Sequence, residues 1–161
     1  MIPKILPFVI GALIAGSMVT SNIPAVEAAG PMSSDAYDQN GESADLAAAA
    51  KLIKLGSYAS AIPILAKSIA SDPRNPDAFN LMGYSQRKIG EKETALGYYL
   101  KALDLDPAHI GANEYLGELY LEMKDPASAT ERLEVLREAC TWPCEEYSRL
   151  EKAISDFKTG N

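Results

Sequence analysis

Apolar and small residues recur with helical spacing between residues 76 and 107. Phe79 and Met82 lie about one turn apart, which predicts a first helix with one apolar face. Gly90 ends this helix, because glycine adopts the left-handed conformation at little cost, and a second apolar stripe follows. The anchors of the segment are Phe79, Met82, Gly83, Gly90, Ala95, Tyr99, Ala102 and Pro107. We predict a helix pair in which Ala95 of the second helix faces the gap left by Gly83 of the first.

The spacing of these anchors resembles the tetratricopeptide repeat, a helix-turn-helix unit of 34 residues. A single pair cannot bury its own apolar face, so neighbouring repeats have to stack on it. The same template fits the 34 residues before this segment, where the match is weaker, and the 34 after it, where single positions depart from it. In the first, Pro63 lies in the second helix, and we expect it early enough there for its missing backbone donor to do little harm. In the last, Lys124 replaces the turn glycine, but Asp125-Pro126 still predicts a turn and a helix start.

The last part of the chain holds half a unit. Tyr147, Leu150 and Ile154 take the apolar anchor positions, but Glu151 stands where the earlier repeats carry glycine. A bulky charged residue there predicts that no further helix crosses at this point, so we expect this helix to cap the stack. Its charged side chains are then expected to face water, namely Glu145, Glu146, Arg149, Glu151 and Lys152.

The resemblance implies an all-α fold, a right-handed α-solenoid of three repeats with a C-terminal capping helix. The expected repeats are residues 42–75, 76–109 and 110–143, and the expected capping helix and tail are residues 144–161.

The start of the chain has the pattern of an export signal. Lys4 is followed by an uncharged apolar stretch over residues 5–19, and Val26-Glu27-Ala28 places small residues where a signal peptidase reads them. We predict a signal peptide over residues 1–28, cleaved after Ala28, because the apolar stretch is shorter than the roughly 18 to 20 residues of a membrane anchor. Residues 29–41 are polar and acidic and are expected to form a disordered linker. The expected location is the periplasm, with secretion as the alternative, and no stable membrane insertion follows cleavage.

Composition excludes some functions. The net charge of −7 and the lack of a run of basic residues argue against nucleic-acid binding, which needs a basic face. No nucleophile elbow, phosphate loop or dinucleotide fingerprint occurs. The single histidine, His109, has no cluster of zinc ligands around it in the sequence, and we expect it to be an exposed spacer. We therefore predict no enzyme activity, no cofactor and no metal.

The two cysteines, Cys140 and Cys144, are expected to form a disulfide, since an exported protein folds in an oxidising compartment. The bridge closes a very short loop, so its expected role is to fix the angle at which the capping helix docks. The alternative is a redox pair or a metal site. The spacing, however, differs from the Cys-x-x-Cys of thiol oxidoreductases, and a metal needs more ligands.

In tetratricopeptide arrays, the first helices of successive repeats line a groove that holds a partner, often a peptide. By the family's pattern, the groove residues here are Leu46, Ala47, Ala50, Ile53, Lys54, Asn80, Leu81, Tyr84, Arg87, Lys88, Glu114, Tyr115, Glu118, Leu121 and Glu122. This predicts a groove that is apolar at one end, basic and aromatic in the middle, and acidic at the other, with a Tyr or Arg anchor. Alternatively, the three groove glutamates of the third repeat only solvate a helix face.

The chaperone-binding members of the family grip a carboxylate terminus with two lysines, two asparagines and an arginine. The matching positions here hold Leu46, Ala50, Leu81, Gly111 and Tyr115, so that function is not expected.

The function expected from the resemblance is a non-catalytic periplasmic adaptor that binds another protein or a peptide and serves an envelope complex. A thiol-redox or metal-handling protein built on the two cysteines is one alternative. Self-association along the apolar end of the groove is another.

Overall fold

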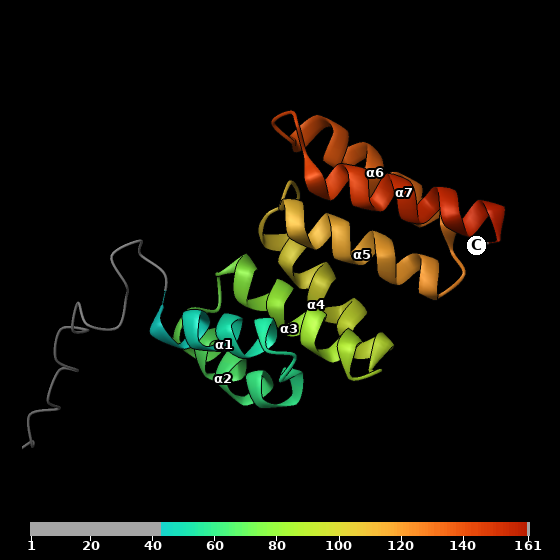
Figure 1. The fold of residues 1–161 in the computed structure, drawn as a ribbon. Helices are drawn as coiled ribbons and strands as arrows, with labels where there is room; N and C mark the ends of the chain where they lie inside the picture. The colour runs from blue at the N-terminus through green and yellow to red at the C-terminus, as the bar shows by residue number, and fades with distance from the viewer. Residues whose placement is uncertain (1–42, 161) are drawn as a thin grey trace, which may run out of the picture. The chain divides into compact units, whose positions relative to one another are not determined.

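The computed structural model describes residues 43–160, which fold into seven α-helices (Figure 1). These are α1 (Ala44–Lys54), α2 (Tyr58–Ser71), α3 (Pro76–Lys88), α4 (Lys92–Leu105), α5 (Ile110–Glu122), α6 (Pro126–Ala139) and α7 (Glu145–Thr159). The predicted signal peptide, the predicted linker and residue 42 lie outside the described residues. Within residues 43–160, no helix is long and apolar enough to cross a membrane.

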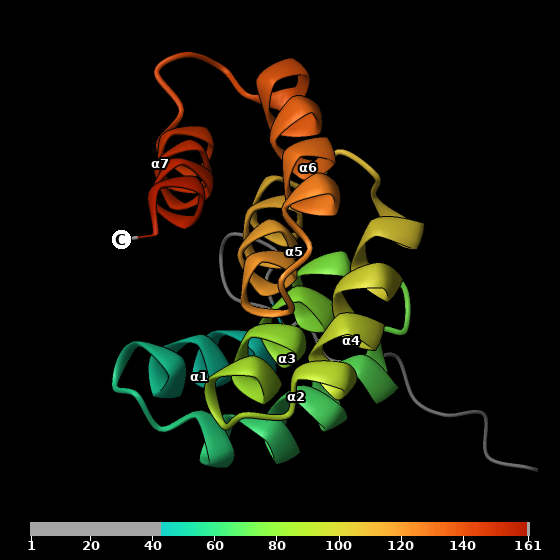
Figure 2. The same ribbon diagram turned by 90° about the vertical axis from the view of Figure 1, so that its right-hand side faces the viewer.

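The helices pack as three pairs, α1 with α2, α3 with α4, and α5 with α6 (Figures 1 and 2). The second helix of each pair also contacts the first helix of the next, α2 with α3 and α4 with α5. Helix α7 contacts both helices of the last pair and ends the stack, which confirms the predicted all-α solenoid with a terminal helix. The apolar face of each pair is thus covered by its neighbour, as expected for a unit that cannot bury its own core.

Turn residues set the helix boundaries. Gly56 and Gly90 follow α1 and α3 with φ of 74° and 96°, in the left-handed region that glycine adopts without steric cost. Lys124 takes the same place after α5 with φ of 64°, where its side chain is unfavourable. The turn predicted at Asp125-Pro126 is confirmed, because the Asp125 side chain accepts a hydrogen bond from the Ser128 amide and caps α6.

The expectation for Pro63 is wrong. Helix α2 begins at Tyr58, so Pro63 is the sixth residue of the helix and lies beyond the first turn. There it removes the bond that a residue with a backbone N–H would donate to the Ala59 carbonyl. The site is exposed, so water can reach that carbonyl.

The gap beside Gly83 is filled by a different side chain from the one predicted. A Cβ atom on Gly83 would lie 2.8 Å from two ring carbons of Tyr99, and Tyr99 is fully buried. The Tyr99 ring, rather than Ala95, therefore takes the space nearest the glycine. Gly117 leaves a similar gap in the last pair, but this gap is filled by Leu150 of α7. The terminal helix therefore packs closely against α5.

Candidate functional site

An open hollow of about 400 Å³ lies between the first helices of the three pairs. Helices α1, α3 and α5 each contribute side chains to it, and the first residue of α2 closes one side. We call it the tyrosine hollow. Its lining is Ala50, Ile53, Lys54, Tyr58, Leu81, Tyr84 and Tyr115. A hollow of this size with aliphatic and aromatic walls is suited to bind an apolar side chain of a ligand.

The tyrosines of the hollow pack against one another. The ring of Tyr84 lies with its centroid 4.7 Å from that of Tyr115 and 5.9 Å from that of Tyr58, the latter edge to face. Lys88 places its Nζ 5.1 Å from the centroid of the Tyr84 ring, a cation–π contact. Burial raises the pKa of Tyr115, and the carboxylate of Glu114 adds to the rise, so its hydroxyl stays neutral and able to donate a hydrogen bond.

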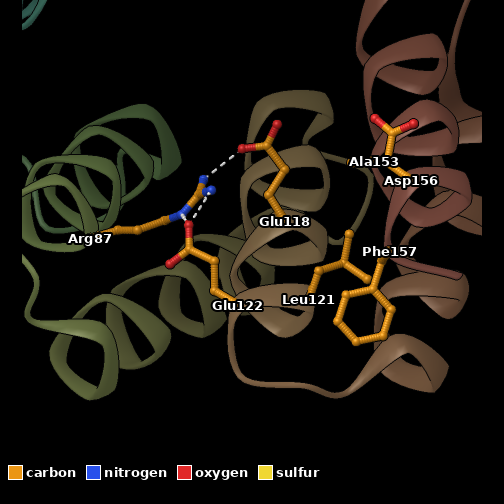
Figure 3. Close-up of a pocket in the computed structure, with 7 residues that line it drawn as sticks. All are labelled: Arg87, Glu118, Leu121, Glu122, Ala153, Asp156 and Phe157. Atoms are coloured by element: carbon orange, nitrogen blue, oxygen red, sulfur yellow. Dashed lines mark hydrogen bonds and ion pairs between the residues drawn. The ribbon is translucent and has the colours of Figure 1, made fainter. Parts of the chain in front are cut away.

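A second hollow, of about 430 Å³, lies between α5 and α7 next to the C-terminal turn of α3 (Figure 3). We call it the salt-bridge hollow, and it is lined by Arg87, Glu118, Leu121, Glu122, Ala153, Asp156 and Phe157. Arg87 donates to Glu118 at 2.6 Å and to Glu122 at 2.7 and 2.9 Å. Its side chain is only 8% exposed, so the guanidinium is occupied within the chain.

These bonds shift the titration of Arg87 and of Glu122. Burial by itself lowers the pKa of Arg87, but the hydrogen bonds to Glu118 and Glu122 outweigh it and raise the pKa above its usual value. For Glu122 the effects are reversed. Burial by itself raises its pKa, but the hydrogen bonds from Arg87 and Lys92 outweigh burial and lower the pKa. Arg87 and Glu122 therefore remain ionised and paired near neutral pH.

Glu114 does not face the groove. Its side chain is 1% exposed and lies under Arg149 of α7, which donates to it at 2.5 Å from Nε and at 3.0 Å from Nη2. Burial raises the pKa of Glu114 even though Arg149 favours its charged form. The prediction of a groove position for Glu114 is wrong. Arg149 is exposed, as expected, and it also links the terminal helix to α5.

The sequence of residues 76–109 matches the tetratricopeptide-repeat family. Residues 76–109 are a tetratricopeptide repeat. These residues correspond to the α3–α4 pair and the turn that leads into α5. No curated protein sequence matches the chain.

Solved structures of tetratricopeptide-repeat proteins show the same fold. The chaperone SycD of Yersinia enterocolitica, in complex with a peptide of the translocator YopD, aligns with a TM-score of 0.64 and 17% identity over 72% of this chain and 91% of that chain. The first repeat domain of Spaghetti (RPAP3), bound to an HSP90 peptide, gives 0.63 and 19% over 71% and 93%. MamA of Desulfovibrio magneticus gives 0.56 and 27% over 59% of this chain and 54% of that chain.

Ten of the fifteen predicted groove residues fall into three groups in the structure. Ile53, Tyr84 and Tyr115 line the tyrosine hollow, and Lys88 lies over the Tyr84 ring. Arg87, Glu118 and Glu122 line the salt-bridge hollow. Leu46, Asn80 and Glu114 are buried and present no surface to a partner.

Leu46 and Asn80 are buried because they pack against neighbouring helices. Leu46 packs in the core between the first two pairs, and Asn80 lies at the α3–α5 contact, where its amide approaches Gly111. The residue-by-residue pattern of the family therefore does not give the depth of each side chain. It also missed Tyr58 and Phe157, which border the hollows from α2 and α7. The only signals for them were the turn glycine shortly before Tyr58 and the apolar stripe of the last helix.

The cysteines form the predicted disulfide. Cys140 ends α6, and Cys144 is the N-cap of α7, with its Sγ accepting a hydrogen bond from the Tyr147 amide at 3.4 Å. The bridge therefore joins the last repeat pair to the terminal helix. Cys144 is buried, whereas Trp142 in the closed loop is 54% exposed and lies edge to face with Tyr147.

His109 is not the exposed spacer that the sequence predicts. Its Nδ1 accepts a hydrogen bond from the Ala112 amide and caps α5, and its Nε2 lies 3.0 Å from Asp77 of α3. The bond to His109 lowers the pKa of Asp77. Over residues 43–160, no group of three or more histidine, cysteine or carboxylate side chains is placed to hold a metal ion. The structure thus gives His109 a capping role between two repeats.

Proposed function

We propose that this chain is a non-catalytic adaptor that binds a segment of a partner protein in the tyrosine hollow. The observation that carries the proposal is the hollow itself, an open space of about 400 Å³ with aliphatic walls and three tyrosines. Interfaces concentrate their binding energy where aromatic side chains surround a pocket that can exclude water. A face with only a structural role would not need such a cluster of half-buried rings around an open hollow.

The fold supports this proposal. Tetratricopeptide-repeat domains are protein-interaction modules, and SycD and RPAP3 were solved with peptides of YopD and HSP90. Because this chain lacks the carboxylate-terminus clamp, binding here has to rely on the hollow. The thiol-redox alternative has no comparable support, since the two cysteines form a disulfide with each other. Cys140 caps the end of α6, and Cys144 caps the start of α7.

We place the adaptor in the bacterial periplasm, where it serves the assembly or maintenance of an envelope complex. The export pattern of residues 1–28 supports this location. The disulfide agrees with an oxidising compartment. Intact-mass measurement of the protein purified from the periplasmic fraction tests it, with cleavage after Ala28 as the expected result. An uncleaved chain recovered from the cytoplasm would contradict the location.

The binding proposal is tested by capture from an envelope extract with three baits, the native exported chain and the variants Ile53→Ser and Leu100→Ser. Ile53 lines the hollow, whereas Leu100 is an exposed leucine of α4 that lines neither hollow. Both variants make the same kind of change, and a melting curve of each confirms that it folds. We expect a partner that the native chain and Leu100→Ser retain and Ile53→Ser loses. Recovery of the same proteins by all three baits would refute the proposal.

A further inference from the structure

The tyrosine hollow is bordered by lysines that have no anionic partner in the described part of the chain. Lys54 lines it, and Lys88 lies over the Tyr84 ring at its edge. No ion pair joins either ammonium group to a carboxylate within residues 43–160. No carboxylate among these residues lines the hollow. The hollow is therefore positive in its immediate surroundings.

The charged side chains around the salt-bridge hollow, by contrast, are paired with one another. Arg87 bonds Glu118 and Glu122, and Lys92 also contacts Glu122. On α7, Lys152 pairs with Asp156. The salt-bridge hollow thus has three carboxylates in contact with three cations. Glu114 is already paired with Arg149.

We infer that the segment bound by this chain is acidic, with one leucine-sized or aromatic side chain inserted into the tyrosine hollow and carboxylates on either side of it bound by Lys54 and Lys88. The inference rests on the proposed function and names the chemistry of its partner. The aliphatic walls from Ile53 and Leu81, together with the tyrosine rings, select the apolar side chain. The two ammonium groups select the charge, and as flexible point charges they accept either Asp or Glu.

The overall charge of the chain makes this inference easy to distinguish from non-specific attraction. The chain carries a net charge of −7, so its long-range field attracts basic peptides and repels acidic ones. A preference for an acidic peptide therefore has to come from local contacts. At exposed lysines such contacts are individually modest, but they act together on either side of the inserted apolar side chain.

The test measures binding of four labelled nonapeptides to the full exported chain by fluorescence anisotropy. The first has a central Leu with two Glu on each side, the second replaces the Glu residues with Gln, the third replaces them with Lys, and the fourth keeps the Glu residues but replaces Leu with Ser. We expect the first peptide to bind about tenfold more tightly than the Gln peptide, with the Lys and Ser peptides weaker than both.

Matched charge reversals assign the preference to the hollow. The double variant Lys54→Glu/Lys88→Glu should favour the Lys peptide over the Glu peptide. The control is Lys51→Glu/Arg74→Glu, which changes the net charge equally at exposed positions outside both hollows and should keep the native order. Lys51 is a close match, since it lies one turn before Lys54 in the same helix.

Equal affinity for the Glu and Gln peptides would overturn the charge preference while leaving peptide binding in the hollow intact. Equal affinity for the Leu and Ser peptides would show that the hollow does not bind the central side chain. The same change of peptide preference in both double variants would show that the lysines of the hollow do not select the charge of the ligand. Failure of all four peptides to bind would also overturn the inference. The proposed function is then judged separately by the capture experiment with Ile53→Ser and Leu100→Ser.

Discussion

Gly83 and Gly97 belong to the same helix pair, and the structure predicts opposite effects when each is changed to alanine. Both lie inside helices, α3 and α4, where alanine is favoured over glycine by about 1 kcal/mol. A Cβ on Gly97 would meet nothing within 4 Å. Gly97→Ala should therefore stabilise the fold by about 1 kcal/mol.

At Gly83 the new Cβ would lie 2.8 Å from the Tyr99 ring, about 1 Å inside the usual carbon–carbon separation. The ring is rigid and fully buried, so it cannot move aside freely. Overpacking of this kind costs about 2 kcal/mol. After the gain in helix propensity, Gly83→Ala should destabilise the fold by about 1 kcal/mol.

Urea unfolding followed by far-UV circular dichroism measures both changes, and the two variants should differ by about 2 kcal/mol in unfolding free energy. The double variant Gly83→Ala/Tyr99→Leu tests the cause. If the Tyr99 ring provides the overlap, Gly83→Ala should cost less in the Tyr99→Leu background than in the native chain. An equal cost in both would refute the packing argument and point back to Ala95. Stabilisation by Gly83→Ala in the native chain would refute it outright.

Three further predictions concern the last repeat pair and the terminal helix. Lys124→Gly should raise the unfolding free energy by about 1 kcal/mol because Lys124 has positive φ, and no such gain is expected for the control Lys124→Ala in the same urea titration. Arg149→Ala should cost about 2 kcal/mol at neutral pH, because it leaves Glu114 buried and unpaired. Burial raises the pKa of Glu114, so its carboxylate binds a proton more readily in the folded protein than in the unfolded chain. Protonation of Glu114 therefore stabilises the fold increasingly as the pH falls from above the raised pKa towards the ordinary value. The cost of Arg149→Ala should shrink over that range, and a cost unchanged from about pH 7 to about pH 4 would contradict the assignment. The native chain should show no reactive thiol when unfolded without reductant, whereas two titratable thiols would exclude the disulfide. The double variant Cys140→Ser/Cys144→Ser should lower the unfolding free energy by about 2 kcal/mol.

The candidate site was only partly predictable from the sequence. The family's spacing brought Tyr84 and Tyr115 to one face, and their rings lie 4.7 Å apart. The same spacing placed Arg87 in the basic and aromatic middle of the groove, with a Tyr or Arg anchor, beside an acidic end. Instead, Arg87 reaches across the helix boundary to carboxylates 31 and 35 residues later. Pairing across helices depends on how far one helix is offset along the next, and one-dimensional spacing does not contain that offset.

The sequence by itself determined the helices, their pairing and their ends. Apolar and small residues at helical spacing decide which face is buried, and glycine or Asx-Pro turns decide where each helix stops. These are local preferences, so they can be read without knowing what packs against the helix. Only the tertiary structure decided that Tyr99 fills the gap at Gly83 and that Glu114 is buried under Arg149. It also decided that, within residues 43–160, no carboxylate lines the tyrosine hollow. Each of these outcomes depends on the distance between side chains far apart in the sequence, which close packing sets only after the helices have stacked.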